Sequence, residues 1–174
     1  MNGNVYLMGF MCSGKTRVGR LLAERLHRAF LDTDDWIVDR AGLSIPDIFE
    51  TRGEAHFRAL EKEAIWHAAS VSDHVVSLGG GAVMDEDNWN RITGSGTTLC
   101  LSYPPEIIES RLARKTDRPL VQQTGRIERM ARIQDLLDRR TARYRQADLV
   151  FHLNRETDPE NVADALAGYL GLYR

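Results

Sequence analysis

Cysteine is scarce in this sequence, and long apolar runs are missing from it. Only Cys12 and Cys100 occur among 174 residues, and their spacing matches neither a C-x-x-C motif nor a zinc site, so disulfides are not expected. No apolar stretch approaches the roughly 18 residues of a membrane-spanning helix, and residues 1–11 carry no basic leader. We therefore expect a soluble protein of the reducing cytoplasm.

An excess of charge of either sign is also lacking. Lysine and arginine together number 23, and aspartate and glutamate number 25, which gives a net charge of −2. Proteins that bind nucleic acid or anionic membranes depend on clustered cations that neutralise phosphates, so we expect neither partner. A chain of this length can bury one core of its own, and we expect a monomer with a single domain over residues 1–174.

Short apolar runs alternate with helical patterns along the chain. Between the runs, apolar residues recur at helical spacing, as at Val18, Leu22 and Leu26, which is typical of a helix that buries one face. The runs that predict strands are residues 5–8, 29–31, 75–78, 98–101 and 149–153. This alternation predicts an α/β fold in which a parallel sheet is covered by helices on both faces.

Capping residues mark the ends of several predicted helices. Ser44 is typical of an N-cap, and Gly53 is expected to end the short helix that follows it. This helix belongs to a helical insert of about residues 33–61, which separates strands two and three. Prolines begin the helices that we predict over residues 104–113 and 159–170.

The segment of residues 114–125 lacks a sustained hydrophobic period. It contains several cations, among them Arg114, Lys115 and Arg118. Because segments between regular elements are commonly mobile and carry function, we predict a positively charged, mobile lid over about residues 112–126.

The strongest motif is a phosphate-binding loop. Residues 9–16 read GFMCSGKT and match G-x-x-x-x-G-K-[ST] between a predicted strand and a predicted helix. In this motif backbone N–H groups and the helix N-terminus face an anion, Lys15 reaches the β- and γ-phosphates, and Thr16 holds Mg²⁺. With glycine at about 7% of residues, a chance match is on the order of one in a hundred. The motif predicts ATP and Mg²⁺ as cofactors, and the alternative is a glycine-rich turn without nucleotide.

Two carboxylates follow the second predicted strand, at Asp32 and Asp34. An extended segment would place both on one side, in the crevice at the carboxyl ends of parallel strands where α/β folds bind ligands. The third run, residues 75–78, lacks the terminal aspartate that holds Mg²⁺ in many phosphate-loop enzymes, so Asp32 is expected to help organise the metal. A solvated turn or a helix N-cap is the alternative for this pair.

A glycine turn and an arginine on an apolar helix face point to an anionic ligand. Gly79, Gly80 and Gly81 follow the third predicted strand and offer close backbone approach and several N–H donors. Arg140 falls at helical spacing on an apolar stripe that includes Leu137. A guanidinium that faces the body of the protein needs an anion.

Arg58 is a second arginine that could bind such a ligand. It follows Phe57, which belongs to a predicted amphipathic helix. Glu54 and Glu61 stand four residues before and three residues after it, so both could pair with it on a solvated face. The spacing leaves both interpretations open.

Together these motifs resemble the shikimate kinase family. The matching segments are residues 9–16, 32–34, 53–58, 79–81, 118–120 and 140–144, in the family's order and almost end to end. The resemblance implies a three-layer, nucleoside-monophosphate-kinase-like fold with a five-stranded parallel sheet. It also implies transfer of the ATP γ-phosphate to the 3-hydroxyl of shikimate, a step of aromatic amino-acid biosynthesis.

The resemblance also implies roles for single residues. Asp34 would bind the shikimate hydroxyls and accept the attacking proton, while Asp32 would support Mg²⁺ held by Thr16. Lys15 and Arg118 would be catalytic because their positive charges stabilise the negative charge on the phosphates. The expected nucleotide-binding residues are Cys12, Ser13, Gly14, Lys15, Thr16, Arg17, Arg111 and Arg118. The expected shikimate-binding residues are Asp34, Arg58, Gly79, Gly80, Gly81 and Arg140, with Phe49 and Phe57 as pocket walls.

Some positions depart from the family pattern. Cys12 stands where the family usually has glycine, so we expect retained but weaker nucleotide binding. Residues 140–144 lack the proline often found before the tyrosine, and the adenine-side loop of residues 154–159 aligns poorly. A gluconate kinase or a non-catalytic nucleotide-sensing domain would share the phosphate loop. The paired arginines favour an acceptor with a ring carboxylate, and Cys12 is the main support for the sensing domain.

Overall fold

A single parallel sheet forms the centre of the computed structural model, which describes residues 3–114 and 125–171. Its five strands stand in the order β2-β3-β1-β4-β5, and every neighbouring pair is parallel. The strands are β1 (Asn4–Gly9), β2 (Ala29–Asp32), β3 (His74–Ser77), β4 (Gly96–Ser102) and β5 (Leu149–His152). Each predicted run falls on one of these strands, so the predicted α/β fold is confirmed.

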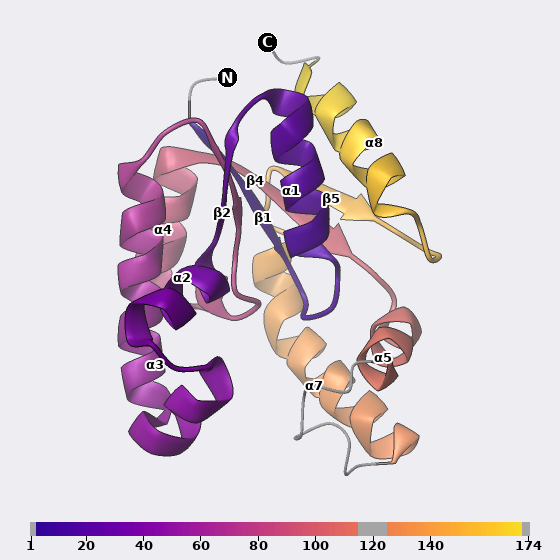
Figure 1. Ribbon diagram of the computed structural model, residues 1–174. Coiled ribbons are helices and arrows are strands. Elements are labelled where there is room, and N and C mark those ends of the chain that lie inside the picture. Colours follow the sequence, from indigo (N-terminus) through magenta and orange to yellow (C-terminus); the bar gives the residue numbers. More distant parts are fainter. Residues whose placement is uncertain (1–2, 115–124, 172–174) are drawn as a thin grey trace.

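Helices cover both faces of the sheet. They are α1 (Lys15–Leu26), α2 (Thr33–Ala41), α3 (Ile45–Ser70), η1 (Ala82–Met84), α4 (Glu86–Ser95), α5 (Pro105–Ala113), α7 (Arg126–Tyr144) and α8 (Pro159–Gly171). Figure 1 shows α1 and α8 on one side of the sheet and α3 and α4 on the other, while α5 and α7 lie beyond the carboxyl ends of the strands. The three layers agree with the predicted architecture. None of the helices in the described ranges is long and apolar enough to cross a membrane.

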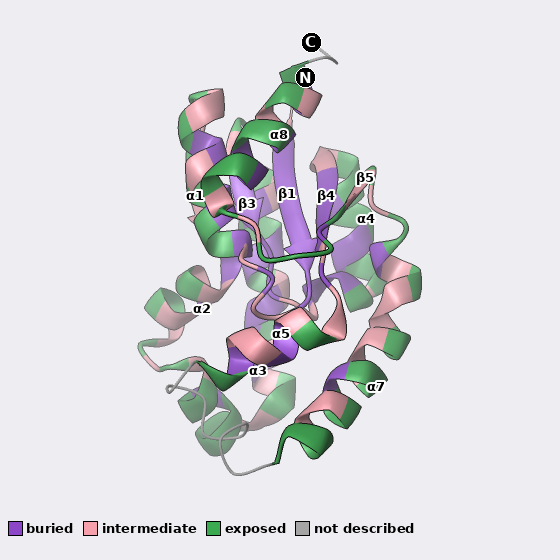
Figure 2. Ribbon diagram, turned by 90° about the vertical axis from the view of Figure 1, so that its right-hand side faces the viewer, coloured by how far each residue is buried: buried purple, intermediate pink, exposed green. Residues whose placement is uncertain are grey.

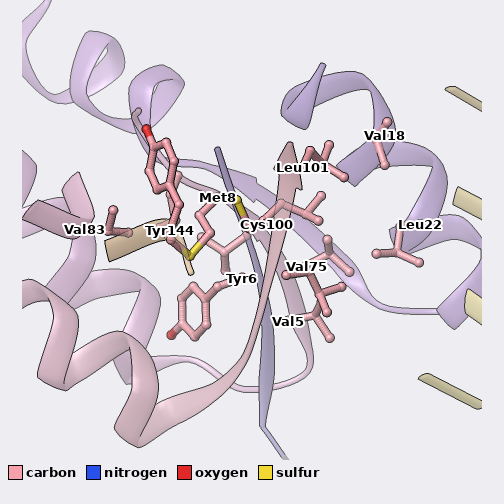
Figure 3. Packing of buried hydrophobic residues seen from close by; sticks show 14 of the residues in the cluster. Val5, Tyr6, Met8, Val18, Leu22, Val75, Val83, Cys100, Leu101 and Tyr144 are labelled. Carbon is pink, nitrogen blue, oxygen red and sulfur yellow. The ribbon is translucent and has the colours of Figure 1, made fainter. Parts of the chain in front are cut away.

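The main core consists of side chains that alternate between the two faces of the sheet. All six residues of β1 are buried, and Figure 2 shows this strand buried along its length. In Figure 3 the side chain of Val5 lies on the side of α1, toward Leu22, whereas Tyr6 and Met8 lie on the side of Tyr144. This alternation follows from the period of two of a strand, and burial on both faces explains why the strand is apolar almost throughout.

Helix α3 is kinked, and with α2 it builds a separate small core. The Ser44 side chain accepts a hydrogen bond from the N–H of Asp47 and caps the helix, as predicted. Gly53 has φ 81° and ψ 171°, which breaks the helical path where the sequence predicts an end. Glycine adopts a positive φ without the steric cost that a Cβ would add. Beyond the main core, Ile37, Ile48, Phe57, Leu60 and Ala64 form their own buried cluster.

Some predictions about the elements were wrong or lie outside the description. Residues 32–34 are not extended, because α2 begins at Thr33 directly after β2. The helix α4 follows the glycine turn and had no counterpart in the sequence analysis. Residues 115–124 of the predicted lid, with Lys115 and Arg118, lie outside the described ranges.

Candidate active site

The phosphate loop connects β1 to α1 at the carboxyl edge of the sheet. Gly14 is the N-cap of α1 and has no side-chain cap, so the first N–H groups of the helix face the loop. The Lys15 side chain is buried and its Nζ donates to the carbonyl oxygens of Gly9 and Phe10, both at 3.0 Å. Burial lowers the pKa of Lys15, and the negative charge of Asp34 opposes that shift. The loop therefore holds a buried cation beside a row of backbone donors, which suits a phosphate.

Ser13 adds an unused polar group inside this loop. Its residue is only 1% exposed, and its Oγ has no hydrogen-bond partner within residues 3–114 and 125–171. Buried hydroxyls are nearly always hydrogen-bonded. A phosphate oxygen in the loop would supply the acceptor that this hydroxyl lacks.

Cys12 adopts a backbone conformation that glycine favours. Its φ is 60°, in the left-handed region, where a Cβ costs about 1–2 kcal/mol. This explains why glycine is usual at this position in the family that the sequence resembles. The Cys12 carbonyl accepts a hydrogen bond from Nη1 of Arg111 at 3.0 Å, so Arg111 lies against the phosphate loop, as expected for a nucleotide-binding residue.

Asp32 links the phosphate loop to α2. One carboxylate oxygen accepts a hydrogen bond from Thr16 Oγ1 at 2.7 Å, and the other accepts from the N–H of Asp34 at 2.9 Å. Asp32 is thus the N-cap of α2, which was the alternative interpretation of this pair, and it is also bonded to the residue expected to hold the metal. A hydroxyl and a carboxylate are hard oxygen donors that fit Mg²⁺, which commonly keeps waters and phosphate oxygens as its other ligands.

Asp34 lies in the first turn of α2 and not on an extended segment, so the predicted geometry of this pair was wrong. Its side chain faces the glycine turn, because a Cβ at Gly79 would lie 2.8 Å from Asp34 Oδ1. Such a distance is shorter than van der Waals contact allows, and a side chain at this position would displace the carboxylate. Glycine at position 79 therefore lets the Asp34 carboxylate lie against the turn.

Both arginines meet at the same glycine turn. A Cβ at Gly81 would lie 3.2 Å from Arg58 Nη1 and 3.7 Å from Arg140 Nη2. Arg140 Nη1 also donates to the carbonyl oxygen of Gly80 at 3.2 Å, and the Tyr144 hydroxyl donates to the same oxygen at 2.8 Å. The predicted acceptor requires these two guanidinium groups to lie together, and the structure brings them together.

Arg58 makes both predicted pairs, one with the exposed Glu54 and one with the buried Glu61. It donates to Glu61 Oε2 at 2.8 Å and to Glu54 Oε1 at 3.1 Å. Glu61 is only 3% exposed; burial raises the pKa of its carboxyl, and the negative charge of Asp34 adds to the increase, while Arg58 opposes it. This buried carboxylate was not predicted from the sequence. Its spacing of four residues from Phe57 was the available signal, because it puts Glu61 on the buried face of the helix.

The remaining predicted residues lie around this centre or outside it. Phe49 and Phe57 contact each other with ring centroids 4.7 Å apart, and Phe57 is buried whereas Phe49 is 39% exposed. Arg17 is exposed on the first turn of α1. Arg118, the expected catalytic residue of the lid, lies outside the described residues.

A phosphate loop at the edge of a five-stranded parallel sheet, next to a carboxylate and two arginines, defines a phosphate-loop kinase of small metabolites. A family model described as shikimate kinase matches residues 11–170. The chain belongs to the shikimate kinase family, and it is therefore an ATP-dependent phosphotransferase.

Known relatives and solved structures agree over nearly the whole chain. The shikimate kinase of Stenotrophomonas maltophilia (strain R551-3) is 44% identical over 165 residues, which cover 94% of this chain and 88% of that protein. The crystal structure of shikimate kinase from Bacteroides thetaiotaomicron has a TM-score of 0.91 at 31% identity, covering 98% of this chain and 99% of that one. Shikimate kinase from Acinetobacter baumannii in complex with shikimate has a TM-score of 0.90 at 33% identity, covering 99% and 94%. The resemblance is thus confirmed, and the two alternatives named from the sequence lose their support.

Proposed function

We propose that the chain transfers the γ-phosphate of ATP to the 3-hydroxyl of shikimate, in the pathway to aromatic amino acids. The observation that carries this proposal is the meeting of Arg58 and Arg140 at Gly81, in the glycine turn that also contacts Asp34, whose charge acts on Lys15. Two guanidinium groups beside a carboxylate suit an acceptor that has an anionic group at one end and hydroxyls at the other. The Acinetobacter baumannii relative is known in complex with shikimate, which supports the same acceptor here.

The arginines would hold the carboxylate of the acceptor. A guanidinium presents a planar fork that matches a carboxylate in a bidentate pair. Arg140 is fixed by its hydrogen bond to Gly80, and Arg58 is fixed by Glu54 and Glu61. Because both side chains are already held in place, little side-chain entropy would be lost when the acceptor binds.

On the phosphate side, the chain positions groups and stabilises charge. Phosphoryl transfer passes through a loose transition state, so most of the rate acceleration comes from positioning and from fixed positive charge. Lys15 and the backbone N–H groups at Gly14 would bind the phosphates, and Ser13 would donate its hydroxyl, which has no partner among the described residues. Mg²⁺, when bound, would neutralise phosphate charge. Thr16 would hold it and Asp32 would orient the Thr16 hydroxyl through the hydrogen bond between them.

Asp34 would orient the attacking hydroxyl. Its carboxylate lies against Gly79 in the glycine turn that both arginines contact, and its charge acts on Lys15 of the phosphate loop. A carboxylate is a weak base for an alcohol, so it would accept the proton late, as the bond to phosphorus forms. Efficient transfer then requires the acceptor hydroxyl to lie within hydrogen-bond distance of Asp34. The arginines, by binding the carboxylate of the acceptor, would hold the hydroxyl at that distance.

The proposal is tested by ADP release from ATP and Mg²⁺ in the presence of shikimate, of gluconate, or of no acceptor. We expect release that depends on shikimate, and a phosphorylated product that carries the phosphate at the 3-hydroxyl. Equal release with gluconate, or release that ignores the acceptor, would contradict the proposal. Product analysis by phosphorus NMR separates acceptor phosphorylation from simple ATP hydrolysis.

The organisation predicted around this centre forms part of the proposal. We propose that residues 33–61 act as the acceptor-binding insert, which the separate core of α2 and α3 supports. A lid over about residues 112–126 that contributes Arg118 remains a prediction from the sequence. So do the monomeric state and the cytoplasmic location.

A further inference from the structure

Arg111 is held by hydrogen bonds along the edge of its guanidinium group. Its Nε and Nη2 both donate to Glu156, with 3.1 Å from Nε to Oε2 and 2.7 Å from Nη2 to Oε2. Its Nη1 donates to the carbonyl oxygen of Cys12 at 3.0 Å. All three nitrogen atoms of the group are therefore engaged in its plane, and the side chain is only 18% exposed.

An aromatic ring covers one face of the same group. Arg111 Cζ lies 4.0 Å from the centroid of the Tyr103 ring, and Tyr103 is buried. Arginine stacks well on aromatic rings because its guanidinium is planar and weakly hydrated. With one face on Tyr103 and the edge bonded to Glu156 and Cys12, the opposite face is the one that a planar ligand can contact.

These four residues come from segments that are distant in the sequence. Tyr103 follows β4, Arg111 stands in the last turn of α5, and Glu156 lies between β5 and α8. Cys12 belongs to the phosphate loop after β1. The carboxyl ends of β1, β4 and β5 thus converge on one guanidinium next to the site where the triphosphate would bind.

We propose that Glu156 and Tyr103 are positioning residues that fix the guanidinium of Arg111 as a flat support for the base of the bound nucleotide. Glu156 sets the rotation of the group in its plane, and Tyr103 supports it from behind. The hydrogen bond to the Cys12 carbonyl connects this support to the phosphate loop. The inference rests on the proposed function, because it takes ATP as the bound nucleotide.

A plain surface ion pair is the competing explanation for the contact between Arg111 and Glu156. Exposed pairs contribute little to stability, and Glu156 is 48% exposed. The two explanations differ in what happens to a ligand without a base. A positioning role affects only ligands that carry the base, whereas a structural role changes the phosphate loop and the binding of any polyphosphate.

The experiment compares the dissociation constants of Mg²⁺-ADP and Mg²⁺-tripolyphosphate by titration calorimetry in wild type, Glu156→Ala, Glu156→Gln and Tyr103→Leu. We expect Glu156→Ala and Tyr103→Leu to weaken ADP binding about fivefold or more, since stacking of a base on a planar side chain contributes measurably to nucleotide affinity. Tripolyphosphate binding should stay within about twofold of wild type. In turnover assays KM for ATP should rise while kcat at saturating ATP changes little, and Glu156→Gln should lie between wild type and Glu156→Ala.

The matched control is Glu160→Gln, because Glu160 is a nearby exposed glutamate that pairs with Arg25 and not with Arg111. It should leave both ligands unaffected. Unchanged ADP affinity in Glu156→Ala and Glu156→Gln would overturn the inference, and so would a parallel loss of tripolyphosphate affinity. Shikimate-dependent ADP release by wild type tests the proposed function separately, so it can succeed while this inference fails.

Discussion

The hydroxyl of Thr16 donates a hydrogen bond to the carboxylate of Asp32, with 2.7 Å between Oγ1 and Oδ2. The two residues stand at the start of α1 and at the end of β2, so this bond joins the phosphate loop to the element that carries Asp34. Asp32 is buried and its second oxygen caps α2. One carboxylate therefore sets the position of both the expected metal ligand and the expected base.

Replacing Asp32 by asparagine tests this double role. Asparagine caps a helix as well as aspartate does, so we expect little change in the melting temperature. The lost negative charge should raise the free Mg²⁺ concentration for half-maximal activity about 10- to 100-fold, as is typical for residues that orient a metal ligand. Asp85→Asn is the control, because Asp85 caps α4 away from the site. An unchanged Mg²⁺ requirement would remove Asp32 from the metal site.

Arg140→Ala should raise KM for shikimate more than it lowers kcat. Hydrogen bonds to charged groups contribute about 1.5–3 kcal/mol, which corresponds to an increase of about tenfold or more. Arg140→Lys keeps the charge but loses the planar fork, so it should recover only part of the affinity. Arg139→Ala is the control, since Arg139 is exposed and pairs with Asp135. Initial rates against shikimate concentration decide the question, and saturation equal to wild type in Arg140→Ala would reject the assignment.

The strands and the phosphate loop were predictable because their signals are local. Buried parallel strands are apolar on both faces, and the spacing of glycine, lysine and threonine in the loop follows from its contact with phosphate. The start of α2 could also have been predicted from the sequence, although we predicted an extended segment there. Asp32 precedes two acidic residues and then Trp36 and Ile37, which is a typical N-cap signal at a helix start.

Other parts of the site depend on contacts that no local pattern contains. Glu156 reaches Arg111 across 45 positions of the chain, and the loop that carries it aligned poorly with the family. Burial of Glu61 arises where α3 packs next to the glycine turn at Gly79. Helical spacing could place Glu61 on the inner face, but it could not show that Asp34 lies nearby.

Glu61→Gln should stabilise the protein at neutral pH. Burial raises the pKa of the Glu61 carboxyl above its usual value of 4.5, so the folded state favours the neutral acid. The protonated Glu61 carboxyl makes its full contribution to the free energy of unfolding below pH 4.5. This contribution is lost as the pH rises through the folded-state pKa. Glutamine stays neutral and avoids that loss. Urea unfolding should therefore show a gain in the free energy of unfolding at neutral pH that shrinks toward pH 4.5.

Glu54→Gln is the matched control for this experiment, because Glu54 pairs with the same arginine but is 67% exposed. It should change the free energy of unfolding little at either pH, as expected for an exposed pair. A Glu61→Gln variant that is less stable than wild type at neutral pH would mean that the pair with Arg58 outweighs the cost of burial.

Cys12→Gly should tighten nucleotide binding and raise stability slightly. The left-handed backbone at Cys12, with φ 60°, costs about 1–2 kcal/mol with a Cβ, and glycine adds about 0.4–1 kcal/mol of entropy to the unfolded chain. The balance favours glycine by up to about 1.6 kcal/mol. Cys12→Val should have the opposite effect, because a β-branched side chain tolerates this region poorly. The melting temperature without ligand measures stability, and its increase in the presence of Mg²⁺-ADP measures nucleotide binding. If glycine and valine change the melting temperature equally, backbone conformation at position 12 does not limit the loop, and the thiol side chain itself must matter there.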